Sequence, residues 1–63
     1  MNVTMTAGQW ETCRNRTDDL PQAIWDEITQ AVDNSERWDT SITLDFPDEW
    51  AKAINATWEE EFA

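Results

Sequence analysis

The chain has 63 residues with a single cysteine, Cys13, and no histidine. It therefore cannot form an intramolecular disulfide, and it lacks the cysteine and histidine ligands of the usual zinc sites. A domain of this size buries only about 60% of the surface of its unfolded chain, so hydrophobic packing alone has to close a small core. Five Trp and two Phe supply much of the apolar volume, because each aromatic side chain buries ~150 to 250 Å². We expect one compact domain over residues 1–63 with the tryptophans mainly in the core.

Residues 37–46, RWDTSITLDF, show the clearest strand pattern. Apolar and polar side chains alternate, so Trp38 and Ile42 should face the core while Asp39 and Asp45 face solvent. We expect one buried face and one wet, acidic face.

A helical pattern follows over residues 47–62 and opens on a proline. Trp50, Ile54 and Trp58 are spaced four apart and form an apolar stripe that should lie on the sheet. Three consecutive glutamates, residues 59–61, occupy the last turn, where the helix dipole disfavours anions. Two interpretations follow: a frayed, solvated terminus, or negative charge presented to a partner.

A second helix is predicted over residues 20–32, where apolar residues recur at i, i+4 and i+8 from Leu20. Asp19, Asp26 and Asp33 recur every seven residues. Seven residues are close to two helical turns, so these carboxylates should form a solvent-facing row that rises ~10.5 Å per step.

The N-terminal stretch MNVTMTAGQWETC alternates apolar residues with Asn or Thr before its only glycine, and then resumes with Trp10. This pattern predicts a short hairpin around Ala7-Gly8-Gln9. The expected fold is therefore α+β in the order ββαβα, with a small antiparallel sheet of about three strands and two helices packed on one face. The predicted core consists of Ile24, Ile28, Trp38, Ile42, Leu44, Trp50, Ile54 and Trp58.

Fourteen acidic residues against four basic ones give the chain a net charge of −10. Residues 1–16 hold one acid and two arginines, whereas residues 17–63 hold thirteen acids and two bases, a net charge of −11. Such a surface repels nucleic acid and anionic membranes and attracts basic surfaces. The sequence shows neither the basic start and apolar run of a signal peptide nor the ~18 apolar residues of a membrane span. We therefore expect a cytoplasmic protein without direct binding to nucleic acid or membrane.

No catalytic apparatus is evident. Nucleophilic catalysis by Cys13 or a serine needs a positioned base, and the chain has no histidine. Carboxylate pairs such as Asp48 with Glu49 leave an acid–base or metal role open, but such pairs are inevitable when 14 of 63 residues are acidic. The single glycine leaves no glycine-rich phosphate loop. We expect a non-enzymatic, monomeric protein with no catalytic, cofactor or metal site.

Rows of carboxylates on a small rigid domain can offer a basic protein a field comparable to that of DNA, which carries one charge per ~1.7 Å of helix axis. The residues that we expect to contact such a partner are carboxylates of the two helices and of the wet strand face: Asp19, Asp26, Asp33, Asp39, Asp45, Glu59, Glu60 and Glu61.

In its length, its acidic body, its lack of histidine and its repeated carboxylates, the chain resembles the small acidic DNA-mimic inhibitors of phages and mobile elements, among them the anti-CRISPR proteins. These features span most of the chain but form no specific motif, so no functional residue is carried over. The resemblance implies a protein of the host bacterial cytoplasm that occupies the DNA- or RNA-binding surface of a defence complex, such as a Cascade-type CRISPR surveillance complex. Target DNA binding would then be blocked.

Two other classes of function fit the same composition. An acidic adaptor or antitoxin-like protein would bind a basic partner, with Trp10 or Trp25 as an exposed anchor of the interface. In a salt-loving organism, an acidic, lysine-poor surface would serve hydration and need no partner.

Overall fold

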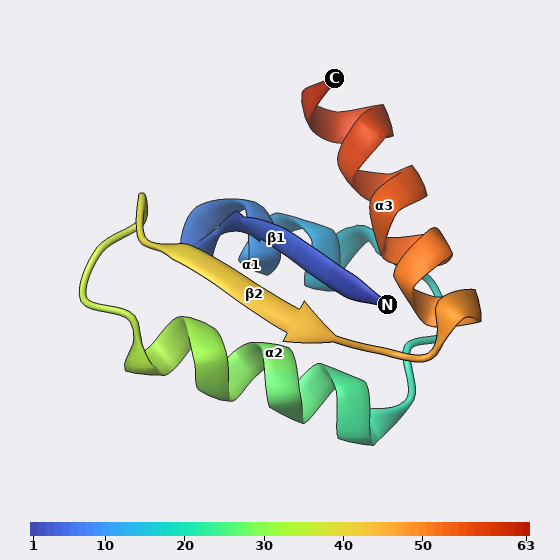
Figure 1. The fold of residues 1–63 in the computed structure, drawn as a ribbon, viewed down its shortest axis with the longest axis horizontal. Helices are drawn as coiled ribbons and strands as arrows, with labels where there is room; N and C mark the ends of the chain where they lie inside the picture. Colours follow the sequence, from blue (N-terminus) through green and yellow to red (C-terminus); the bar gives the residue numbers. More distant parts are fainter.

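The computed structural model describes all 63 residues. It is an α+β fold, a two-stranded antiparallel sheet with three helices in the order βααβα (Figure 1). The elements are β1 (Asn2–Thr6), α1 (Ala7–Arg16), α2 (Gln22–Asn34), β2 (Ser41–Asp45) and α3 (Asp48–Phe62). No helix combines the length and the apolar character needed to cross a membrane.

The sheet has one buried face and one exposed face. Val3 lies opposite Leu44 and Met5 opposite Ile42, and the alternating burial of both strands places these four side chains on the face that the helices cover. The other face carries mostly hydroxyl side chains and is exposed. The alternation of apolar and polar side chains predicted over residues 37–46 is therefore confirmed for the five residues of β2.

The predicted N-terminal hairpin is wrong, because the chain enters a helix where a turn was expected. Thr6 caps α1: its Oγ1 accepts a hydrogen bond from the Gln9 backbone N–H at 3.2 Å, and its own N–H donates to Gln9 Oε1 at 3.0 Å. This reciprocal pair is a capping box, which satisfies two backbone donors that a helix start leaves free. Trp10 and Cys13, one turn apart on α1, are fully buried. The sheet consequently has two strands instead of three.

The strand predicted over 37–46 is shorter than expected and begins at Ser41. Residues 35–40 form a loop that bonds to the first turn of α1 instead of to β1. The Ala7 N–H donates to the Thr40 carbonyl and the Gly8 N–H to the Trp38 carbonyl, both at 3.0 Å. Because β1 has already turned into helix at Ala7, no strand is available to pair with this segment. Trp38 is 67% exposed and lies outside the core, contrary to the prediction.

The two predicted helices are present with shifted starts. α2 begins at Gln22, after Pro21 as its N-cap residue, and α3 begins at Asp48, after Pro47. Asp19 precedes α2 in a turn and has a left-handed backbone with φ of 60°. Asp19 therefore does not lie on α2, and the predicted helical row of three carboxylates is reduced to Asp26 and Asp33.

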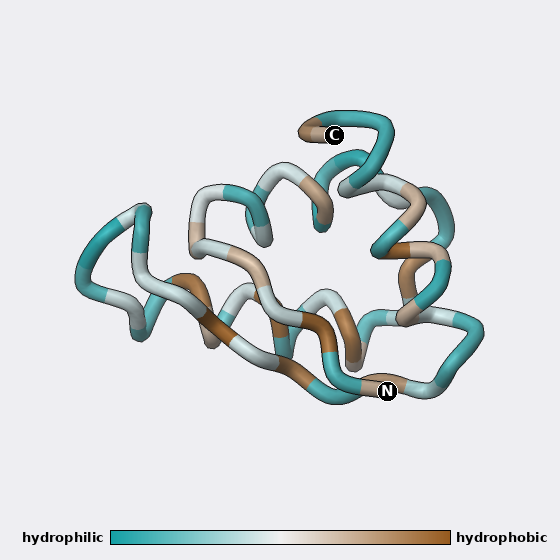
Figure 2. Tube along the Cα trace, turned by 45° about the horizontal axis from the view of Figure 1, so that its top comes forward, coloured by the Kyte–Doolittle hydropathy of each residue, from teal (hydrophilic) through white to brown (hydrophobic).

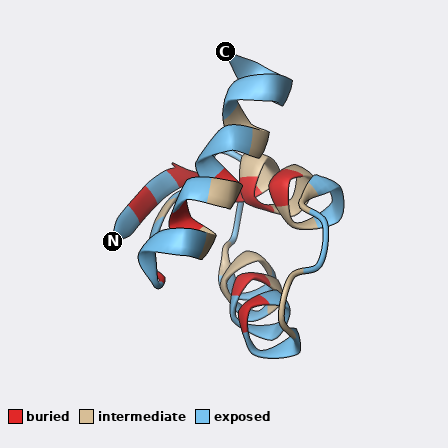
Figure 3. Cartoon of the chain, turned by 90° about the vertical axis from the view of Figure 1, so that its right-hand side faces the viewer, coloured by how far each residue is buried: buried red, intermediate tan, exposed pale blue.

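The core lies between the sheet and the three helices, and Figure 3 shows buried segments on the facing sides of these elements. Phe46 meets Trp10 edge to face, with ring centroids 5.8 Å apart. Of the predicted core residues, Ile24, Ile28 and Ile54 are buried, and Ile42, Leu44, Trp50 and Trp58 are partly buried against the core. The core residues below 9% exposure are Val3, Met5, Ala7, Trp10, Cys13, Ile24, Ile28, Phe46, Ala51 and Ile54.

Candidate partner-binding surface

An acidic segment connects α1 to the loop before β2. No basic residue occurs between Arg16 and Arg37, whereas six acidic residues do. All six are exposed, and none of them takes part in any of the ion pairs of the structure. We call this set the acidic segment: Asp18, Asp19, Asp26, Glu27, Asp33 and Glu36.

Asp26 and Asp33 form the regular part of the acidic segment. Both lie on the solvent side of α2, opposite Ile24 and Ile28, and helix geometry places them ~10.5 Å apart along the axis. Asp26 accepts a hydrogen bond from the Gln22 side chain at 2.8 Å. The predicted row is thus a pair on the helix, preceded by two aspartates in the turn.

The two carboxylates nominated on the strand are compensated by nearby positive charges. Asp39 lies in the loop, and its carboxylate is 3.3 Å from Arg37 Nε. Asp45 lies on β2 and accepts a hydrogen bond from the N-terminal ammonium of Met1 at 2.8 Å. This hydrogen bond raises the pKa of the amine above its ordinary value of 8.0; desolvation opposes the rise, and the negative charges of Asp45 and Asp48 add to it. Both carboxylates therefore have a cationic partner within the fold, although both remain exposed.

The three glutamates at the end of α3 do not form one row, because consecutive helical residues point about 100° apart. Glu61 points toward α1 and lies 3.9 Å from an Arg16 guanidinium nitrogen. It also faces Cys13: burial, and then the Glu61 charge, raise the pKa of that thiol to about 11. Glu59 and Glu60 are exposed, on the part of the helix that projects from the body (Figures 1 and 3).

The sequence-based reasoning missed a pocket of about 340 Å³ at the C-terminal end of α2. Its walls come from the first turns of α1, the last turn of α2 and the loop that follows. Trp38 forms one wall, and Glu11, Asp33 and Glu36 contribute carboxylates. The turn-forming run DNSER before Trp38 was the available signal, but the alternation after it favoured a longer strand.

The tryptophans nominated as interface anchors are not free. Trp10 is fully buried. Trp25 is 36% exposed, but the Arg14 guanidinium covers its ring at 4.7 Å from the centroid. Trp38 is the tryptophan that the fold leaves accessible.

No three acidic or cysteine side chains gather closely enough to hold a metal ion. Comparisons of the chain with protein-family models, with curated proteins and with solved structures find no match.

Proposed function

We propose that the protein is a non-enzymatic inhibitor that presents DNA-like negative charge to the DNA- or RNA-binding surface of a host defence complex. A Cascade-type CRISPR surveillance complex is the partner that we favour, and target DNA binding is the step that would be blocked. The observation that carries this proposal is the acidic segment, whose six exposed carboxylates have no cationic partner in the fold. Unpaired like charges destabilise a compact domain, so local stability does not explain them.

The charge density of the molecule supports the proposal. The longest dimension of the domain is 28 Å, and a duplex of that length carries about 16 phosphate charges at one per ~1.7 Å. The chain has a net charge of −10 over the same length. Hydrophilic residues also dominate the loop before β2, in which the acidic segment ends (Figure 2).

Contacts with the core and with α1 anchor α2, the helix that carries Asp26, Glu27 and Asp33. Ile24 and Ile28 anchor one side of α2 in the core. Arg14 of α1 donates a hydrogen bond to Thr29 Oγ1 at 2.9 Å and lies over Trp25. A helix fixed in this way holds Asp26 and Asp33 at constant spacing, which lowers the entropy cost of binding a matching set of lysines and arginines.

Reversal of charge on α2 and on α3 tests the proposal. The variant Asp26→Lys/Asp33→Lys and its matched control Glu59→Lys/Glu60→Lys each change the net charge from −10 to −6. We expect the α2 variant to lose inhibition of target DNA binding by a purified surveillance complex, measured by gel shift, while the α3 variant keeps most of it. Circular dichroism would check the fold of both. Equal losses would indicate nonspecific attraction, and full inhibition by the α2 variant would exclude this mode of mimicry.

A second candidate function is that of an acidic adaptor or antitoxin-like protein, and the exposure of Trp38 favours it. A solvent-exposed tryptophan beside carboxylates is a typical interface anchor. Duplex DNA distinguishes the two candidates. A mimic should be displaced from its partner by duplex DNA and should lose affinity steeply as salt is added, because both ligands compete for the same lysines and arginines.

A further inference from the structure

We propose that the pocket at the C-terminal end of α2 binds the guanidinium group of an arginine from the partner protein. Trp38 is the surface on which the guanidinium stacks, and Asp33 and Glu36 supply the negative charge around it, since the third carboxylate of the pocket, Glu11, lies 3.9 Å from Arg14 Nη2. The inference rests on the proposed function for the source of the arginine, because proteins that grip DNA carry arginines on their binding surface. The site itself is tested without that partner.

The pocket has the size of a small ligand site. Its volume of about 340 Å³ lies at the lower end of the roughly 300 to 1,000 Å³ range of ligand pockets. Three separate elements line this open pocket: the start of α1 at Ala7, the end of α2 at Val32 and the loop that carries Trp38. It therefore suits one side chain better than a continuous strand or helix of a partner.

Trp38 is fixed in place although it is exposed. The Gly8 N–H donates a hydrogen bond to the Trp38 carbonyl at 3.0 Å. The indole packs so closely on α1 that a Cβ added at Gly8 would lie 3.1 Å from Trp38 Cε3. Two thirds of the residue's surface is still accessible. A fixed, accessible indole is the preferred platform for a cation, which the negative face of its ring attracts.

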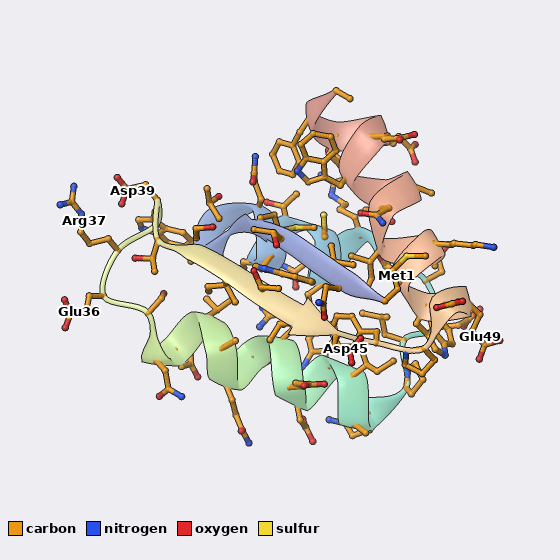
Figure 4. All side chains as sticks on the ribbon, viewed as in Figure 1. Met1, Glu36, Arg37, Asp39, Asp45 and Glu49 are labelled. Carbon is orange, nitrogen blue, oxygen red and sulfur yellow. The ribbon has the colours of Figure 1, made fainter.

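The electrostatics of the pocket favour a cation. α2 has no basic residue in its last turn, so nothing in that turn offsets the negative end of its dipole, where cations are stabilised. Asp33 and Glu36 add two unpaired carboxylates. Arg37 also lines the pocket, but its guanidinium pairs with Asp39 at the tip of the loop and points away from the body (Figure 4).

Arginine fits this arrangement better than other cations. A guanidinium is planar, more weakly hydrated than an ammonium, and able to stack on an indole while donating hydrogen bonds from its edge. The carboxylates stand around the pocket and do not converge as metal ligands would. Within this chain, Arg14 already combines the two interactions, with its guanidinium 4.7 Å from the Trp25 ring and bonded to Thr29 Oγ1.

Binding of short peptides to the isolated domain tests the site. The probe is an acetylated, amidated alanine pentapeptide with one central arginine, compared with the same peptide carrying lysine or neutral citrulline. NMR of the ¹⁵N-labelled protein resolves the five tryptophan indole N–H groups. We expect the Trp38 signal to move most, the arginine peptide to bind about two- to fivefold more tightly than the lysine peptide, and the citrulline peptide to have no effect.

Two variants and one matched control decide the outcome. Asp33→Asn and Trp38→Ala should each weaken binding of the arginine peptide about two- to fivefold. Asp26→Asn removes the same charge from the same helix, away from the pocket, and should change it little. Equal effects of Asp33→Asn and Asp26→Asn, or unchanged binding by Trp38→Ala, would overturn the proposal. If the peptides bind with this pattern but the protein inhibits no surveillance complex, the arginine site stands and only the proposed mimicry of DNA is refuted.

Discussion

The indole N–H of Trp10 donates a hydrogen bond of 2.9 Å to the backbone carbonyl of Ile42 and so connects α1 to β2 from within the core. Trp58 presents the opposite case, because its indole nitrogen is buried without any hydrogen-bond partner. Leaving a buried donor unsatisfied costs about 1 to 3 kcal/mol, whereas a satisfied one contributes about 1 kcal/mol. The two tryptophans should therefore respond differently to the same substitution.

Trp10→Phe should destabilise the domain by about 2 to 3 kcal/mol, because it removes part of the volume of a filled core together with the hydrogen bond from the indole to the Ile42 carbonyl. Trp58→Phe also replaces an indole by a smaller ring, but it removes a buried donor that has no partner. The free energy of unfolding of this variant should therefore differ from that of the wild-type protein by less than about 1 kcal/mol. Urea unfolding followed by circular dichroism measures both. Similar losses in the two variants would contradict the contrast between their indole nitrogens.

Asp19→Gly should stabilise the fold by up to about 1 kcal/mol, because Asp19 has a left-handed backbone that glycine adopts without steric cost. Asp18→Gly is the matched control: it removes the same charge from the same turn, at a residue with an ordinary φ. It should destabilise by a few tenths of a kcal/mol through the added freedom of the unfolded chain. Thermal melting compares them, and a common shift would mean that charge, not backbone geometry, dominates at this turn.

Alkaline pH should destabilise the protein through Cys13. Its pKa is about 11 in the folded state against an ordinary value of 9.0, so the unfolded chain loses its thiol proton first. Stability is therefore fully present below pH 9 and falls by up to about 2 kcal/mol as the pH rises to 11. The chain has no tyrosine or histidine and only one lysine, so few other groups titrate there.

Cys13→Ala is the control for that pH profile. It retains the N-terminal amine, whose raised pKa also lowers stability as the pH rises above 8, but it lacks the thiol. Its free energy of unfolding should fall less between pH 9 and 11 than that of the wild-type protein. Parallel profiles would show that the thiol does not contribute.

Moderate NaCl should raise the melting temperature, because it screens the repulsion among unpaired carboxylates. The double variant Asp26→Asn/Asp33→Asn should gain less from salt than the wild-type protein does. Scanning calorimetry from low salt upward measures both effects, and a melting temperature that falls with added NaCl would contradict this account of the surface. A domain that unfolds in low salt would instead favour the salt-adaptation hypothesis, since a mimic has to persist there.

Periodicity along the chain was sufficient to predict part of this fold. The spacing of Ile24 with Ile28 and of Trp50 with Ile54 gave both long helices, and the alternation around Ile42 gave the strand, because each pattern reports a local period. α1 escaped prediction because a glycine follows Ala7 and its apolar positions are few. The Thr6–Gln9 capping box was its available signal.

The acidity of residues 17–63 and the lack of a second cysteine for an intramolecular disulfide are properties that the sequence alone determined. Which charges are free was decided only by the tertiary structure. From spacing along the chain, all the nominated carboxylates were expected to be free, among them Asp19, Asp39, Asp45, Glu61, Asp26 and Asp33. The fold instead pairs Asp45 with the N-terminus, 44 residues away, and turns Glu61 toward Arg16. The position of Trp38 was decided in the same way, since β1 becomes a helix at Ala7 and leaves the segment before Ser41 no strand to join. Periodicity describes one element at a time, whereas compensation of charge and exposure of a loop depend on contacts between elements distant in the chain.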